Sequence, residues 1–287
     1  MRETFIAGAV IGGIASLLFL LERFIPLRRA RRPLASRLLV NLAFASLAFA
    51  TVSLAVRPAA EAMLGWTIRA SFGLLHLPVV PVAARPILAF LLMDLTFYWW
   101  HRANHQIPVL WRFHNVHHID PDLDVSTAFR FHFGEIALSS AFRVAQLGLI
   151  GPSFWAYAVY ELVFQANTLF HHSNVRLPIR CERLLNLLLV TPRMHGIHHS
   201  QVMAETNSNY SSVFPWWDRL HRTLGLNVPQ AGIEIGIPAY ARAEDNRLWF
   251  ALAIPFRAQR RYWSREDGTT AVREPAGRRG ESTRLAQ

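Results

Sequence analysis

Uncharged runs of residues recur along the first third of the chain. Residues 5–21 and 38–56 contain no charged side chain, and residues 86–100 contain only Asp94. A helix that crosses the hydrocarbon core of a bilayer needs about 20 mostly apolar residues. The three runs are therefore predicted to be transmembrane helices, with Trp99 and Trp100 at the end of the third as aromatic anchors.

Two more apolar segments, residues 136–150 and 152–170, follow later and are separated by a Gly-Pro step. Because such a step breaks a helix, the pair is predicted to form a hairpin that leaves one membrane face and returns to it. Arg143, inside the first segment, is expected either to extend its side chain toward the membrane surface, which is the favoured alternative, or to be buried against a partner. The apolar pattern thus predicts an all-α integral membrane protein with about four transmembrane helices.

Other stretches are apolar but unsuited to crossing a membrane. Residues 70–84 contain Pro78 and Pro81, which favours a broken or re-entrant segment. Residues 248–256 are too short to cross and are expected to lie in the membrane interface.

The polar remainder completes a predicted division of the chain. Residues 264–287 are charged and rich in glycine, which predicts a disordered tail. The predicted parts are an N-terminal region of spans with a basic cytosolic loop (1–85), a histidine-containing domain (86–225), a C-terminal interfacial segment (226–263) and the tail (264–287).

Arginines crowd the segment that follows the first apolar run. They are Arg23, Arg28, Arg29, Arg31, Arg32 and Arg37. Cytoplasmic loops carry an excess of basic residues, so this loop is predicted to be cytoplasmic. Because the arginines adjoin apolar runs, the net charge of +11 indicates a membrane surface and no nucleic-acid partner. The only cysteine, Cys181, excludes a disulfide framework and cysteine-based metal sites.

Most of the 13 histidines lie in four short motifs, HRANH, HNVHH, FHHSN and HGIHH. Histidines three or four residues apart share one face of a helix. Imidazole is a common ligand of transition metals, and these histidines outnumber the positions around one ion. The motifs therefore predict two metal ions side by side, and the predicted topology brings all four to the cytoplasmic face. His76 and His221, which stand alone, are expected to be structural.

The motifs lack a residue that zinc proteases need, and this absence argues against a zinc-hydrolase mechanism. None of the three clusters with helical spacing contains the glutamate of the HExxH zinc-protease pattern. Two redox metals at a membrane face would suit activation of O2 against a C–H bond of a lipid. The alternatives are a membrane metal transporter or metal-binding protein and a zinc-dependent lipid hydrolase. Transport sites usually lie at the middle of the bilayer, whereas these motifs lie beyond the predicted spans.

The motif set, together with FRFHFGE, FHHSNVRLP, TPRMHGIHH, NSNY and WWDRL, resembles the fatty acid hydroxylase/sterol desaturase superfamily over roughly residues 90–225. The resemblance implies a membrane enzyme, an O2-dependent monooxygenase of the non-haem di-iron type. It implies two iron ions, O2 as co-substrate and a membrane lipid or sterol-like substrate that is hydroxylated or desaturated. Residues 86–225 are thereby expected to be the catalytic domain.

The resemblance also implies the metal ligands. They are His101, His105, His114, His117, His118, His171, His172, His195, His198 and His199. Of the pair in FHHSN, His172 matches the family better. Some relatives have an HxxxH pair near this point, and here Asn167 stands four residues before His171, so the number of ligands stays open by one or two.

Three further residues are candidates for a catalytic or supporting role. Asp94 is an acid inside a predicted span, which is a functional candidate by default. His132 and Glu135 lie three residues apart on one helical face, and support of the ligands is favoured over direct binding. Asp120, Asp122 and Asp124 follow HNVHH and are expected to form a solvated loop.

Electrons must reach such a site from outside. The sequence contains neither a glycine-rich nucleotide fingerprint nor the HPGG signature of a fused cytochrome b5 domain. A separate donor of the cytochrome b5, ferredoxin or reductase type is therefore expected.

Overall fold

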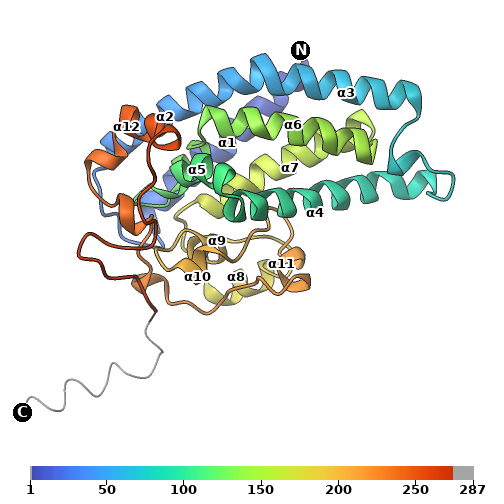
Figure 1. The fold of residues 1–287 in the computed structure, drawn as a ribbon. Coiled ribbons are helices and arrows are strands. Elements are labelled where there is room, and N and C mark those ends of the chain that lie inside the picture. Colours follow the sequence, from blue (N-terminus) through green and yellow to red (C-terminus); the bar gives the residue numbers. More distant parts are fainter. Residues whose placement is uncertain (1, 274–287) are drawn as a thin grey trace, which may run out of the picture.

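The computed structural model describes residues 2–273, with side chains from Ile6 onward. Its long helices lie side by side as a bundle (Figure 1). They are α1 (Arg2–Phe24), α2 (Leu34–Thr51), α3 (Arg57–Ala70), α4 (Arg85–Gln106), α6 (Phe133–Ile150) and α7 (Phe154–His172). A π-helical turn, Val52–Val56, joins α2 and α3 into one continuous rod along the top of Figure 1.

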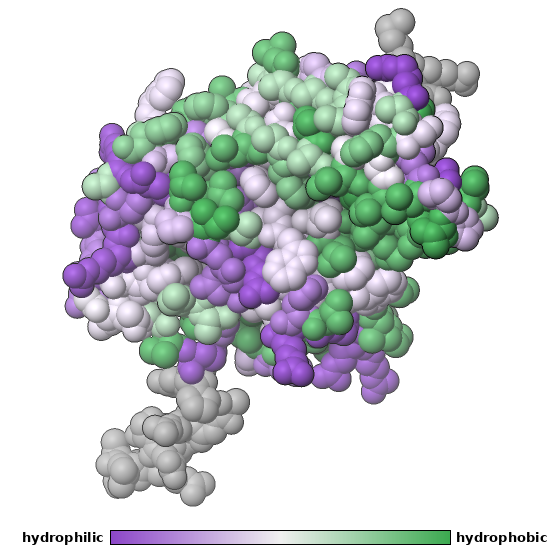
Figure 2. Space-filling model, turned by 45° about the vertical axis from the view of Figure 1, so that its right-hand side comes forward, coloured by the Kyte–Doolittle hydropathy of each residue, from purple (hydrophilic) through white to green (hydrophobic). Residues whose placement is uncertain are grey.

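Four segments of the described chain are long and apolar enough to cross a membrane, namely Ile6–Phe24, Leu34–His76, Val82–Gln106 and Phe133–Ile150. Many of their large side chains are exposed, among them Leu39, Phe49 and Leu54. A water-soluble surface rarely leaves so much apolar area uncovered, whereas lipid covers it at no cost. Figure 2 shows hydrophobic side chains gathered over the upper and right parts of the molecule. The predicted all-α membrane architecture is confirmed.

The second of these segments is longer than the run 38–56 predicted. Arg57 and Glu61 interrupt the apolar pattern, but they form an ion pair of 2.7 Å one turn apart and are half-exposed, so the helix continues through them. It ends where Ser71 and Gly73 adopt positive φ. At Gly73 a Cβ would collide with the backbone of Gly151, so glycine allows the α3–α4 link to lie against the α6–α7 link. The predicted broken segment 70–84 contains two short 3₁₀ turns, Leu74–His76 and Val82–Ala84.

The core of the bundle lies where α4, α6 and α7 meet. Met93, Leu147 and Tyr160 are fully buried there. Arg143 of α6 also lies inside, where its Nη2 pairs with Oε1 of Glu161 at 2.8 Å and its Nη1 contacts Gln146. The expectation that Arg143 extends to the membrane surface is therefore wrong. A partner carboxylate on the adjacent helix satisfies the charge inside the bundle.

Short helices form a cap at one end and along one side of the bundle (Figure 1). They are α5 (Pro108–His118), α8 (Ile179–Leu185), α9 (Pro192–His198), α10 (Met203–Thr206), α11 (Trp216–Leu220) and α12 (Leu248–Ala253), with a 3₁₀ turn at Val125–Phe129. The described part of the chain has isolated β-bridges but no strand. α5 begins with Pro108 at its first turn and buries Trp111 and Val116 on its inner side.

The C-terminal part of the described chain packs back onto this cap. Ala251 of α12 and Ile254 are buried in a cluster with Phe44 and Trp111, while Trp249 stays exposed. Of the predicted tail, residues 264–273 are described, and Arg273 pairs with Glu205 at 2.7 Å. Residues 274–287 lie outside the described residues.

Candidate metal centre

Four helices bring histidines to one point. α4 supplies His101 and His105 at its end, α5 supplies the HNVHH motif, α7 ends at His172, and α9 carries the HGIHH motif. The ligand atoms form two groups, and within each group they lie within 4.8 Å of one another. The first group is His101, His105, His114, His118 and His198, and the second group is His117, His172, His195 and His199.

Each HxxHH motif contributes to both groups. His118 and His198 belong to the first group, whereas their sequence neighbours His117 and His199 belong to the second. Successive residues of a helix point about 100° apart, so two adjacent imidazoles reach different points. The two groups adjoin, because the rings of His118 and His199 are stacked with centroids 4.3 Å apart. The geometry therefore has places for two ions side by side.

In the first group, hydrogen bonds fix which ring nitrogen faces the centre. The Nδ1–H of His101 donates to the carbonyl of Tyr210 at 2.7 Å, and that of His198 donates to the carbonyl of Ser208 at 2.6 Å. A carbonyl can only accept, so Nδ1 carries the proton and Nε2 of a neutral ring carries a lone pair. Such outer partners orient metal-binding histidines in proteins.

The resulting lone pairs face one another. Nε2 of His101 and Nε2 of His198 lie 3.1 Å apart, and neither ring has a proton to place between them. Metal–imidazole bonds of about 2.1 Å set two nitrogens bound at right angles about 3.0 Å apart. Nε2 of His105, His114 and His118 is buried with no hydrogen-bond partner among the described residues. A cation satisfies all five nitrogens, so the residues present fit a metal ion.

The second group repeats this pattern. The Nδ1–H of His172 donates to the carbonyl of Thr168 at 2.8 Å, which leaves its Nε2 with a lone pair. That nitrogen lies 3.0 Å from Nε2 of His117 and 3.0 Å from Nε2 of His195. Nε2 of His195 is in turn 3.1 Å from Nε2 of His199. Four converging imidazoles without a carboxylate favour a transition metal over calcium or magnesium.

Burial keeps these rings neutral. It lowers the pKa of His195 and His199 well below the ordinary value, and the neighbouring imidazoles lower it further. Burial likewise lowers the pKa of His198 to about 3, against a hydrogen bond from the ring to Ser208 that raises it. Neutral imidazole is the form that binds a metal.

The metal-free protein should therefore lose stability on acidification. Between pH 6.5 and 3 an unfolded His198 binds a proton that the folded residue does not, so the free energy of unfolding falls as the pH falls. At pH 5 this one residue costs about 2 kcal/mol relative to pH 7. Thermal unfolding of chelator-treated protein from pH 7 to 5 measures the effect. A constant Tm would contradict the burial of neutral histidines.

Glu135 supports the first group. Its Oε1 accepts the Nδ1–H of His114 at 2.7 Å, and both residues are buried. The side chain thus orients a histidine and is not a member of either group. The supporting role of Glu135 stays a prediction, which the following variant tests.

We expect Glu135→Gln to weaken metal binding at the first group by about 10- to 100-fold, because an amide is a poorer and neutral acceptor for the Nδ1–H of His114. Competition with a chelator, followed by metal analysis, measures this. Glu244→Gln, on an exposed turn, is the matched control and should bind metal as the wild type does. Equal affinities for all three proteins would remove Glu135 from the support of the site.

Two other candidates lie apart from both groups. Oδ2 of Asp94 accepts the backbone N–H of Phe214 at 3.0 Å and the indole N–H of Trp217 at 2.8 Å, and thereby ties α4 to α11 and to the residues just before it. Nδ1 of His132 accepts the N–H of Gly134 at the start of α6, and its Nε2 contacts the carbonyl of Leu252 at 3.2 Å. These contacts tie Asp94 and His132 into the packing of the bundle and the cap, and the catalytic or supporting roles expected of them stay predictions.

His171 lies at the edge of the second group without joining it. Its ring is close to that of His195, with centroids 4.1 Å apart. The amide of Asn167 contacts Nδ1 of His171 at 3.4 Å and donates to the carbonyl of Ser212 at 2.6 Å. Nine of the ten predicted ligands therefore lie in the two groups, and His171 and Asn167 pack beside them.

His76 and His221 lie outside both groups, and His221 stacks on Tyr98.

The three aspartates after HNVHH are buried, so the expectation of a solvated loop is wrong. Asp120, Asp122 and Asp124 are 0%, 7% and 3% exposed. Arg37 of α2 pairs with Asp120 at 2.7 Å and with Asp124 at 2.6 Å. Burial alone would raise the pKa of Asp120, but the guanidinium groups of Arg37 and Arg130 hold it at about 2.

Sequence patterns gave no signal for several groups that complete the site. The carbonyl acceptors of Tyr210, Ser208 and Thr168 belong to the backbone, so residue type does not reveal them. The ring of Tyr210 also lies beside His101 and His105, with centroids 5.9 and 5.2 Å apart. Ser208 and Tyr210 fall in a motif, NSNY, that the resemblance had singled out, whereas Thr168 falls in none.

Comparisons with known proteins agree with this site. Residues 86–223 match the family model described as fatty acid hydroxylase. The ornithine lipid hydroxylase OlsE of Rhizobium tropici is 34% identical over 161 residues, which is 55% of this chain and 46% of the relative. The alkylglycerol monooxygenase of Homo sapiens is 33% identical over 138 residues, or 47% of this chain and 29% of the relative.

A more distant match is the very-long-chain aldehyde decarbonylase GL1-8 of Oryza sativa subsp. indica, 30% identical over 156 residues, 54% of this chain and 57% of the relative. The alignments thus span less than two thirds of each of these relatives. No solved structure matches significantly. The resemblance drawn from the histidine motifs is confirmed, and residues 86–223 of this chain are a domain of the fatty acid hydroxylase family, within the fatty acid hydroxylase/sterol desaturase superfamily.

Proposed function

We propose that this protein is a membrane-bound di-iron oxygenase that hydroxylates a C–H bond of a lipid. The observation that carries the proposal is the pair of adjoining, buried imidazole groups at the end of a bundle of apolar helices. Relatives named for acting on ornithine lipid and alkylglycerol support a lipid substrate with a polar head. The desaturation alternative keeps the same site and differs only in the product.

Bound in the two groups, a pair of iron ions would activate O2, which is the oxidant, so that one of its oxygen atoms could be inserted into an unreactive C–H bond. The nine histidines would hold the ions through neutral imidazole nitrogens, which activated O2 does not readily oxidise. Glu135 and the carbonyls of Tyr210 and Ser208 keep the rings oriented. Burial of the rings excludes water from the reacting atoms.

Reduction of the second oxygen atom to water requires two electrons and two protons. We propose that a separate protein of the cytochrome b5, ferredoxin or reductase type supplies the electrons from the cytoplasm. The basic loop between α1 and α2 supports a cytoplasmic position for the cap.

The single cysteine offers a direct test of this sidedness. Cys181 is exposed on α8 of the cap. We expect a membrane-impermeant maleimide to label inside-out vesicles and to leave intact cells unlabelled until they are permeabilised. Cys181→Ser, which should not be labelled in either preparation, is the control. Labelling of intact cells would place the cap on the outer face.

Metal content and oxygen uptake test the activity. We expect about two irons per chain in the purified protein, and O2 consumption that needs both a reductant and a lipid. Lipid profiles of cells with and without the protein would then identify the oxidised product. A protein that binds one zinc per chain and consumes no O2 would favour the zinc-dependent hydrolase, and metal flux into vesicles would favour the transporter.

A further inference from the structure

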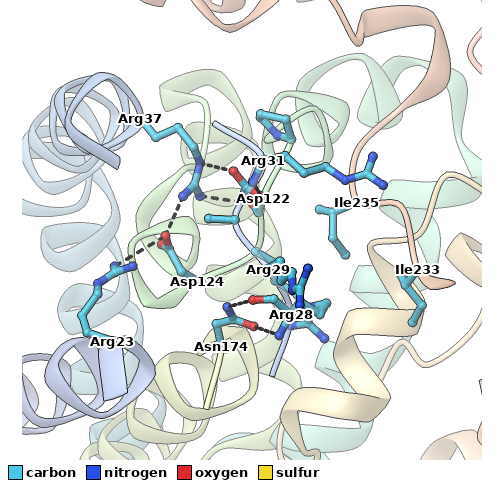
Figure 3. A pocket seen from close by; sticks show the side chains of 13 residues that line it. Arg23, Arg28, Arg29, Arg31, Arg37, Asp122, Asp124, Asn174, Ile233 and Ile235 are labelled. Carbon is cyan, nitrogen blue, oxygen red and sulfur yellow. Dashed lines mark hydrogen bonds and ion pairs between the residues drawn. The ribbon is translucent and has the colours of Figure 1, made fainter. Parts of the chain in front are cut away.

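A pocket lined by arginines lies where the loop between α1 and α2 meets the residues that follow HNVHH. Arg23, Arg28, Arg29, Arg31 and Arg37 contribute to its wall, and Asp122 and Asp124 are its only acidic residues among those described (Figure 3). The pocket holds about 30 Å³, which is room for about two water-sized groups. It therefore suits the leading oxygens of a small anion and not a whole lipid.

Arg28 is the buried member of this set, at 8% exposure. Its Nη1 donates to Oε1 of Gln230 at 2.6 Å and to the carbonyl of Pro192 at 3.4 Å. Its Nε and Nη2 are buried and have no hydrogen-bond partner among the described residues. These two nitrogens form the edge of the guanidinium that binds carboxylates and phosphates through two parallel hydrogen bonds.

The charge of Arg28 also lacks a close partner in the described part of the chain. Glu182 is occupied by Arg193, which it accepts at 2.6 Å. The carboxylate of Asp122 accepts the backbone N–H groups of Arg31 and Arg32. Burial lowers the pKa of Arg28 to about 10, so the side chain remains cationic at neutral pH. An unpaired buried charge is unfavourable, and an anion at its free edge would offset that.

The chain holds this guanidinium rigidly. Asn174 accepts the backbone N–H of Arg28 at 2.9 Å and donates to its carbonyl at 2.8 Å. The guanidinium lies against Gly196 of α9, which stands in the sequence between His195 and His198. A Cβ at this position would collide with the guanidinium. A free edge that is fixed in place loses little entropy on binding.

We propose that this pocket binds a phosphate-class oxyanion, with two of its oxygens on Nε and Nη2 of Arg28. Arg29 and Arg31 lie at the exposed mouth and raise the local potential for an anion. The loop follows directly on Phe24, where the first apolar helix ends, so a lipid head group and free phosphate both have access. The site is separate from the histidine groups and does not depend on the proposed oxygenase activity.

Binding can be measured on the full-length, metal-loaded protein in detergent by calorimetry. The probes are inorganic phosphate, dihexanoyl phosphatidic acid and, as the head-group-free control, dihexanoylglycerol, all at constant ionic strength. We expect saturable binding of phosphatidic acid, phosphate or both, and none of dihexanoylglycerol. Affinity for phosphatidic acid at least tenfold above that for phosphate identifies a lipid head group. Similar affinities identify a site for the free anion.

Variants locate the binding at Arg28. Arg28→Gln should abolish it, and Arg28→Lys should weaken it about tenfold, because lysine keeps the charge but lacks the two-donor edge. Ala30→Glu, on the exposed wall, should also block binding while leaving the packing of Arg28 intact. Arg242→Gln, on an exposed turn, is the matched control for charge. No saturable binding to the wild type, or undiminished binding to Arg28→Gln and Ala30→Glu, would overturn the proposal.

Discussion

His198→Ala should lose both metal binding at the first group and oxygenase activity, while the protein still inserts into the membrane. The variant removes an Nε2 that lies 3.1 Å from Nε2 of His101, and it frees the carbonyl of Ser208. Loss of a group that only hydrogen-bonds a metal-binding histidine costs metal affinity about 10- to 100-fold, and loss of a ligand should exceed that range. Metal analysis of purified protein and O2 uptake measure the two effects.

The rise in Tm on metal loading is an independent measure of metal binding by the folded protein. A ligand that binds only the folded state stabilises it, so the wild type should gain more in Tm on loading than His198→Ala does. His76→Ala, in the 3₁₀ turn between α3 and α4 and outside both groups, is the matched control. It should keep its metal, its activity and its gain in Tm. If the two variants behaved alike, the division between ligand and structural histidines would be wrong.

Asp120→Asn should destabilise the fold by about 3–5 kcal/mol, the usual cost of removing one partner from a buried ion pair. Oδ1 and Oδ2 of Asp120 accept Nε and Nη2 of Arg37 at 2.7 and 2.9 Å, and Oδ2 also accepts Asn41 and Thr127. An asparagine is neutral and would leave the buried charges of Arg37 and Arg130 opposed only by Asp124 and by Asp122, which lies 3.8 Å from Arg37. Thermal or denaturant unfolding in detergent measures the change.

Two further variants make this expectation specific. Asp267→Asn, on an exposed turn where the carboxylate hydrogen-bonds Thr269, should change stability by about 0.5 kcal/mol or less. Arg37→Met combined with Asp120→Leu removes both charges of the 2.7 Å pair, but it also removes the 2.6 Å partner of buried Asp124 and the carboxylate that faces Arg130. It should therefore destabilise the fold at least as much as Asp120→Asn alone. If Asp120→Asn were as stable as Asp267→Asn, the network would not hold α2 against the segment that follows HNVHH.

Spacing along the chain was sufficient to predict the helices and nearly all the candidate ligands. Apolar runs predicted the bundle because the hydrocarbon core sets a minimum length for a crossing helix. The HRANH and HxxHH motifs predicted shared helical faces because i, i+3 and i+4 positions are neighbours on any helix. These are local properties, and they do not depend on what packs against the helix.

Contacts between segments far apart in the sequence decided which polar side chains are buried and how the histidines divide between the two groups. Whether Arg143 reaches the surface depends on Glu161 of the next helix, and whether Asp120 is solvated depends on Arg37, 83 residues away. The assignment of His117 and His118 to different groups depends on where α4, α7 and α9 lie relative to α5. The position of the Arg28 guanidinium likewise depends on Gln230 and Pro192, which accept its Nη1 from distant parts of the chain.

The amino-acid sequence by itself therefore determined the membrane bundle, the histidine chemistry and the family. The tertiary structure alone decided how the nitrogens divide between two groups and which acceptors orient them. It also decided which charges are buried in pairs. The physical reason is that helix formation follows from neighbouring residues, whereas the burial and pairing of a polar group depend on partners that folding brings from elsewhere in the chain.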